Sequence, residues 1–104
     1  SIFMVKDKDN YLLRLRKDVS FFSKPIIKKK FESIPENSNL LIDITRAEYI
    51  DRDIMETIEE FMQQAPNKKI NVQLSGTVMN GNGSKGFVKI NSLKPKRVYD
   101  DVAH

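Results

Sequence analysis

The chain has 104 residues, of which 39% are hydrophobic, and its formal net charge is +4. This length provides for one hydrophobic core, since domains typically hold about 100 to 150 residues. The absence of cysteine excludes a disulfide framework, a thiolate nucleophile and the usual structural zinc sites. No stretch approaches the roughly 20 consecutive apolar residues of a membrane helix, so we expect the chain as given to be soluble.

The charge is spread unevenly along the chain. Residues 75–104 carry 5 Lys and Arg against 2 Asp and Glu, which leaves 13 against 12 for residues 1–74. We therefore expect a core domain over residues 1–74 and a basic, Gly/Asn-rich tail over residues 75–104, partly flexible, with one short strand near residues 87–90. Because the core is nearly neutral, we expect no nucleic-acid partner.

A β-hairpin is predicted at the start of the chain. Residues 2–5 are apolar, residues 6–10 form a polar turn, and then apolar and basic side chains alternate with the period of a half-buried strand. The apolar positions of that second strand are Tyr11, Leu13 and Leu15.

A short amphipathic helix is predicted next. Ser23 is suited to capping it, and Pro25 lies in its first turn, where a missing N–H costs nothing. Pro35 bounds the pattern. The apolar side chains recur at i, i+4 and i+7, in Ile27, Phe31 and Ile34.

Residues 40–44 form an apolar run broken only by Asp43, which is typical of a central strand covered on both faces, so helices should flank it. A second helix is predicted from Asp51, where Asp51 and Asp53 can cap its first N–H groups, and Pro66 bounds it. Its apolar stripe is Ile54, Ile58, Phe61, Met62 and Ala65.

A last core strand is indicated by the alternation of Ile70, Val72 and Leu74. The order β-β-α-β-α-β predicts a layered α/β domain. Its central sheet should be mixed, largely parallel and flanked by helices.

The segment 45–53 is the candidate site, predicted as a loop between the central strand and the second helix. Ligands of open α/β sheets meet the carboxyl ends of strands and the N-termini of helices. Its candidate residues for a ligand or a partner are Thr45, Arg46, Asp51, Arg52 and Asp53. Two interpretations stay open, because the two arginines can bind an anion or can pair with Glu48, Asp51 or Asp53.

Other motifs point to no catalysis. Residues 81–86 match G-x-G-x-x-G, but an extended segment follows where a dinucleotide site needs a helix, so we interpret them as a flexible loop. We interpret Lys28, Lys29 and Lys30 as a solvated face, with a membrane-facing role as the sharper alternative. Capping and an exposed helix face account for the carboxylates, and His104, the single histidine, supplies neither a triad nor a multi-histidine metal site.

Two segments carry a family resemblance. Residues 18–24, DVSFFSK, and residues 42–54, IDITRAEYIDRDI, resemble the STAS domain of SulP-type inorganic anion transporters, and the similarity extends in order over residues 2–74. It implies a STAS-like fold and a C-terminal domain at the cytoplasmic face of the cell membrane, with a regulatory, assembly or trafficking role. The transmembrane domain of the same full-length chain would be its partner, and neither a cofactor nor catalysis is expected.

STAS domains also occur as stand-alone anti-sigma-factor antagonists, which phosphorylation switches at a Ser at the start of the second helix. The equivalent positions here are Arg52 or Asp53, so that switch is not carried over. A second STAS domain, another cytosolic protein or a nucleotide are further partners to test. After Leu74 the sequence departs from longer STAS domains, in which another helix follows.

Overall fold

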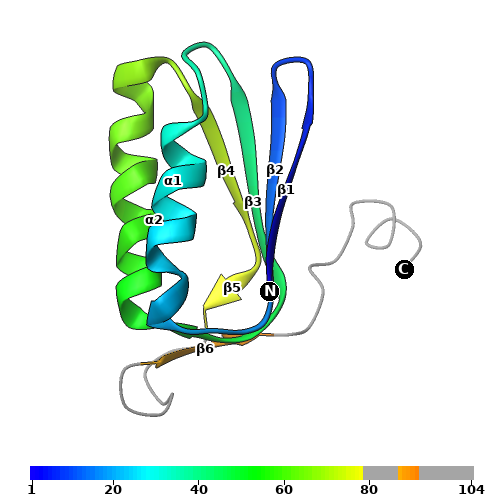
Figure 1. Ribbon diagram of the computed structural model, residues 1–104, viewed down its shortest axis with the longest axis vertical. Helices are drawn as coiled ribbons and strands as arrows, with labels where there is room; N and C mark the ends of the chain where they lie inside the picture. Colours follow the sequence, from blue (N-terminus) through cyan, green and yellow to red (C-terminus); the bar gives the residue numbers. More distant parts are fainter. Residues whose placement is uncertain (79–86, 92–104) are drawn as a thin grey trace, which may run out of the picture.

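The computed structural model describes residues 1–78 and 87–91 of the chain. Within these residues, two α-helices and two short 3₁₀ turns pack with a mixed β-sheet (Figure 1). The elements in chain order are β1 (Ile2–Asp7), β2 (Asn10–Val19), η1 (Phe21–Ser23), α1 (Lys24–Glu32), β3 (Asn39–Asp51), α2 (Arg52–Gln64), η2 (Ala65–Lys68), β4 (Asn71–Ser75), β5 (Thr77–Val78) and β6 (Phe87–Asn91).

Strand β3 is the centre of the sheet. It runs parallel to β2 on one side and, through its first half, parallel to β4 on the other. Strands β1 and β2 form the predicted antiparallel hairpin, while β6 pairs antiparallel with the last residues of β3 and with β5. The order β-β-α-β-α-β and the α/β fold class are thus confirmed, and β5 and β6 follow this core in sequence.

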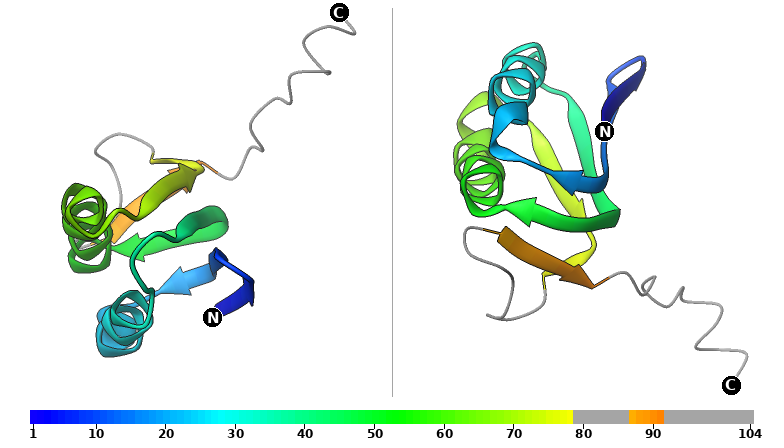
Figure 2. Two further views of the ribbon diagram at one scale, coloured as in Figure 1. Left: turned by 90° about the horizontal axis from the view of Figure 1, so that it is seen from above. Right: turned by 60° about the horizontal axis from the view of Figure 1, so that its bottom comes forward.

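Both helices lie on the same face of the sheet (Figure 2), so the prediction that β3 is covered on both faces is wrong. Leu40, Ile42 and Ile44 alternate toward the helices and are almost fully buried, whereas Leu41 between them keeps 38% of its surface exposed. The misleading signal was the run of apolar residues, which only Asp43 interrupts. Asp43 occupies an outward position of the strand, which is why a carboxylate is tolerated there.

Helix α1 begins without the predicted cap. Ser23 has helical backbone angles (φ −82°, ψ −5°), and its side chain makes no capping hydrogen bond. The chain enters α1 through the 3₁₀ turn η1, so the N–H of Ser23 already donates to the carbonyl of Ser20 at 2.9 Å. The core residues Ile27 and Phe31 lie on the helix as predicted, while Ile34 is buried just beyond its end.

The two helices are joined by an aromatic contact. The rings of Phe31 in α1 and Phe61 in α2 stack almost in parallel, with centroids 4.2 Å apart and an interplanar angle of 7°. Ile54 and Ile58 of α2 are completely buried against the sheet. This packing fixes the direction of α2 and therefore the position of its N-terminus, where the candidate site begins.

Candidate functional site at the junction of β3 and α2

The segment 45–53 is not a loop, which corrects the prediction. Strand β3 continues to Asp51, and α2 begins at the next residue, Arg52. The physical reason is that both edges of this half of β3 find partners. Residues 46–50 pair with β2 across two irregularities of register, and residues 49–51 pair with β6. Backbone groups that sequence reasoning left to solvent are therefore used in the sheet.

Asp51 caps α2, as predicted. Its Oδ1 accepts a hydrogen bond from the backbone N–H of Asp53 at 2.8 Å, which satisfies one of the free donors of the first turn. Asp53 is bound differently, since its Oδ2 lies 3.7 Å from Nζ of Lys24 in α1. Both side chains of this ion pair are partly exposed to solvent, so it adds little to the stability of the domain. Its main effect is to connect the start of α1 with the start of α2.

Arg46 and Arg52 are both exposed. Within residues 1–78 and 87–91, neither forms an ion pair with a carboxylate, so the interpretation in which they pair with Glu48, Asp51 or Asp53 is wrong for these residues. Asp53 pairs with Lys24 instead. The other interpretation, in which the two arginines bind an anion, stays a prediction.

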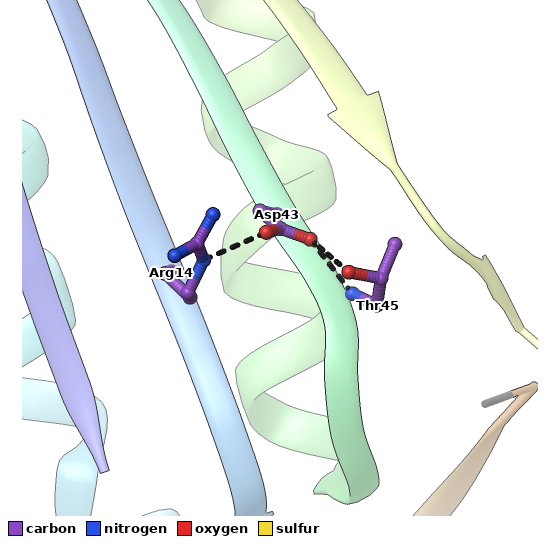
Figure 3. A network of polar contacts seen from close by, with 3 residues as sticks. All are labelled: Arg14, Asp43 and Thr45. Atoms are coloured by element: carbon purple, nitrogen blue, oxygen red, sulfur yellow. Dashed lines mark hydrogen bonds and ion pairs between the residues drawn. The ribbon is translucent and has the colours of Figure 1, made fainter. Parts of the chain in front are cut away.

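Thr45 belongs to a polar network on the helix-free face of the sheet (Figure 3). Its backbone N–H and its hydroxyl both donate to Oδ1 of Asp43, at 2.9 and 2.6 Å. The other carboxylate oxygen, Oδ2, accepts from Nε of Arg14 in β2 at 2.8 Å. All of the donors converge on one carboxylate that is only 7% exposed.

The network keeps Asp43 charged. Burial disfavours the carboxylate and by itself raises the pKa of Asp43. The hydrogen bonds from the hydroxyl and backbone of Thr45, together with the hydrogen bond and the charge of Arg14, outweigh burial and hold the pKa below its ordinary value. A carboxylate of lowered pKa is a poor general base at neutral pH, so this arrangement is suited to stabilising the sheet.

The five candidate residues therefore fall into two groups. Thr45 and Asp51 are six residues apart on one strand, which corresponds to at most about 20 Å along an extended chain. The group at the helix start contains Asp51, Arg52 and Asp53, and the group at mid-strand contains Thr45 and Arg46. Sequence reasoning missed Arg14 and Lys24, although an arginine alternating with buried leucines, one strand away from a lone carboxylate, was a usable signal for Arg14.

The first hydroxyl on α2 is that of Thr57, and it is neither exposed nor free. Thr57 keeps 8% of its surface, and its Oγ1 donates to the backbone carbonyl of Asp53 at 2.8 Å. The first turn itself holds Arg52 and Asp53. Within the described residues, the start of α2 thus offers no accessible side-chain hydroxyl.

Other candidate chemistry adds no site to the described part of the chain. Residues 1–78 and 87–91 contain no group of three or more side chains placed to hold a metal ion. A groove between α1 and α2, lined in part by Lys28, Phe31 and Phe61, has a volume of about 180 Å³, below the roughly 300 to 1,000 Å³ of small-molecule sites. The G-x-G-x-x-G segment at 81–86 and His104 lie outside the described residues.

These features define a class, a small mixed α/β domain whose central strand leads directly into a capped helix. The family model described as "STAS domain" matches residues 1–79, and the chain belongs to the STAS domain family. The domains of this family generally have binding or regulatory roles and are not catalytic.

A structural comparison agrees with this fold. The solved structure described as "Crystal Structure Analysis of Mglu" has a TM-score of 0.58 and 16% sequence identity, over 69% of this chain and 18% of that one. The chain thus spans less than a fifth of that protein, and the likeness concerns the fold alone. No curated protein sequence matches the chain. Among the described residues, no helix is long and apolar enough to cross a membrane.

Proposed function

We propose that the chain is the cytoplasmic STAS domain of a SulP-family inorganic anion transporter. In this role it regulates, assembles or directs the transporter and carries out no catalysis, and its main partner is the transmembrane domain of the same protein. A second STAS domain or another cytosolic protein is a further partner of the same kind. Membership of the STAS family supports a binding or regulatory role, and the start of α2 favours the transporter branch.

The observation that favours the transporter over the stand-alone antagonist is the set of side chains in the first turn of α2. Stand-alone antagonists are switched by phosphorylation of a hydroxyl at this place, but here the cap is Asp51, followed by Arg52 and Asp53. The nearest hydroxyl of the helix, on Thr57, is buried and hydrogen-bonded to the backbone. A phosphate there would need to break that bond and open the helix–sheet packing, at a cost of several kcal/mol for a buried, unpaired charge.

The alternative is a stand-alone partner-switching protein of the anti-sigma-factor-antagonist type. The exposed Arg46 in the second half of β3 and the exposed Arg52 at the start of α2 favour it, because they are charged side chains that a partner protein can contact. Without a phosphorylatable group there, such a protein would need another switch. The two functions differ in the size of the native protein, which makes them easy to separate.

The reading frame upstream of the Ser1 codon tests the proposal. A SulP transporter predicts about ten or more apolar segments, each of the roughly 20 residues needed to cross a bilayer. A complete short reading frame without such segments would exclude the transporter and favour the partner-switching alternative.

Nucleotide binding at residues 45–53 is tested separately, by following the amide NMR signals of the domain. GTP or ATP is titrated into the labelled domain, and the amide signals of Arg46, Asp51 and Arg52 are followed. Shifts that saturate would place a nucleotide at the junction of β3 and α2. The absence of shifts at millimolar nucleotide would exclude it and leave a protein partner as the ligand to seek.

A further inference from the structure

Two phenyl rings lie on the surface where the chain enters α1. Phe22 keeps 83% of its surface exposed and Phe21 52%, and their ring centroids are 5.4 Å apart. Ile26, one turn further along, is also 52% exposed. Large apolar side chains that are exposed singly need no explanation, but three that are close in sequence at the start of one helix form a patch that favours contact with an apolar partner.

The flank of α1 next to this patch is basic. Ile26, Lys29 and Lys30 line a shallow hollow together with Met4 of β1 and Ser33. The hollow is lined by no carboxylate among the described residues, and the core-facing side chains Ile27 and Phe31 point elsewhere. Exposed aromatic and aliphatic groups beside lysines are the combination found on protein surfaces that lie in the headgroup region of an anionic membrane.

The start of α1 lies at the end of the domain where the chain begins (Figure 1). The main chain of Ser1 pairs with Arg16 of β2, through the Ser1 nitrogen and the Arg16 carbonyl at 3.2 Å and the Arg16 N–H and the Ser1 carbonyl at 2.9 Å. Strand β2 ends at Val19, and η1 with both phenyl rings follows almost at once. A membrane span attached before Ser1 would bring this end of the domain close to the bilayer.

We propose that Phe21, Phe22, Ile26, Lys29 and Lys30, here called the α1 patch, dock the domain on an anionic lipid surface. The two rings and Ile26 enter the boundary between headgroups and acyl chains, while the ammonium groups remain among the anionic headgroups at the ends of their apolar stems. A protein partner is disfavoured by the flexible lysines, which are depleted in the cores of protein interfaces. The proposal deepens the proposed function and rests on it for the presence of a nearby membrane.

The chain contains no tryptophan, so a single introduced indole reports on its own position. In Phe22→Trp, the fluorescence emission is expected to move to shorter wavelength on addition of phosphatidylcholine vesicles that contain phosphatidylserine, and to move much less with pure phosphatidylcholine. The matched variant is Phe3→Trp, because Phe3 is a 39% exposed ring on the helix-free face of the sheet. An equal shift in both variants, or no shift in Phe22→Trp, would overturn the proposal.

Vesicle flotation of the 104-residue chain gives a second readout. Phe21→Ser/Phe22→Ser is expected to lower the partition coefficient by about tenfold or more, because two exposed rings lose their transfer from water. Lys29→Gln/Lys30→Gln should lower it by a similar factor and reduce its dependence on salt, since each lysine near an anionic surface contributes about a fivefold change. The matched control is Lys68→Gln/Lys69→Gln, two exposed lysines at the end of η2 and directly after it, outside the α1 patch.

The basic residues of 75–104 are unchanged in every variant, so their contribution cancels in these comparisons. Circular dichroism establishes that each variant is folded. Partition that the Phe21→Ser/Phe22→Ser change leaves unaltered would overturn the proposal, and so would the absence of binding at millimolar anionic lipid, which would indicate a protein on this patch. Neither result alters the upstream reading frame, so failure of membrane docking and failure of the transporter assignment are distinguishable.

Discussion

Arg14 and Asp43 meet across two neighbouring parallel strands, with Nε and Oδ2 2.8 Å apart, on the face of the sheet that carries neither helix. The pair is side by side in register, and Thr45 completes the hydrogen bonding of the carboxylate. The charge of Asp43 in the middle of the central strand is tolerated because Arg14 and Thr45 donate hydrogen bonds to it on the same face of the sheet. Two predictions about the stability of the domain follow from this contact between Arg14 and Asp43.

Replacing Asp43 with Asn should destabilise the domain. Hydrogen bonds to charged groups contribute about 1.5 to 3 kcal/mol each, and the change leaves the partly buried guanidinium of Arg14 without its counter-charge. Urea unfolding followed by circular dichroism measures the effect. Arg46→Met, which removes an exposed arginine without an ion pair in the described residues, is the control and should change the free energy of unfolding by less than about 0.5 kcal/mol. Equal midpoints for Asp43→Asn and the parent chain would contradict this account of the network.

The contribution of Asp43 should disappear in acid. The pKa of Asp43 is lowered in the folded state, so its stabilisation is fully present above the pKa of about 3.9 of an unfolded aspartate and is lost as pH falls through the folded value. The difference in free energy of unfolding between the parent chain and Asp43→Asn should therefore be constant at neutral pH and shrink below about pH 4. Urea titrations across this range measure it, and a difference that grows on acidification would have the wrong sign.

A third prediction concerns the N-terminal cap of α2. Asp51→Ala should cost about 0.5 to 2 kcal/mol, because the N–H of Asp53 loses its acceptor. Asp51→Asn keeps an acceptor oxygen at the same place and should recover most of the loss. Thermal and urea unfolding of the two variants separate the hydrogen bond from the charge. If both variants lose the same stability, the helix dipole rather than the capping bond is the main effect.

A fourth prediction concerns Gly76, which lies directly after β4 and has a backbone φ of +123°. A Cβ added there would lie 2.5 Å from Cγ1 of the buried Ile44. Gly76→Ala should therefore destabilise the domain by about 1 to 3 kcal/mol, through backbone strain together with a clash in the core. Thr77→Ala, an exposed change at the next residue, is the control. A Gly76→Ala variant as stable as this control would show that the chain after β4 adapts freely.

The sequence predicted the element order well because the patterns that encode it are local. The alternation of Tyr11, Leu13 and Leu15 and the stripe through Ile54 and Ile58 both lie on buried faces, as their periods require. The capping residue Asp51 was likewise readable, since the bond to Asp53 joins residues two positions apart. These features depend on no contact between distant parts of the chain.

The rest required three-dimensional information. Whether a sheet face is covered depends on the placement of both helices, and the apolar run around Asp43 gave the wrong answer. The continuation of β3 to Asp51 depends on pairing with β2 and β6, which are distant in sequence. The contacts of Asp43 with Arg14 and of Asp53 with Lys24 span 29 residues in each case, so neither followed from a local pattern.

The most direct test of the central proposal is the size and location of the native protein. An antibody raised against the domain is used to probe membrane and soluble fractions of the native cells. We expect a band in the membrane fraction with a mass several times the 12.1 kDa of this chain, resistant to salt and alkaline washing. A soluble protein of about the mass of this chain would contradict it.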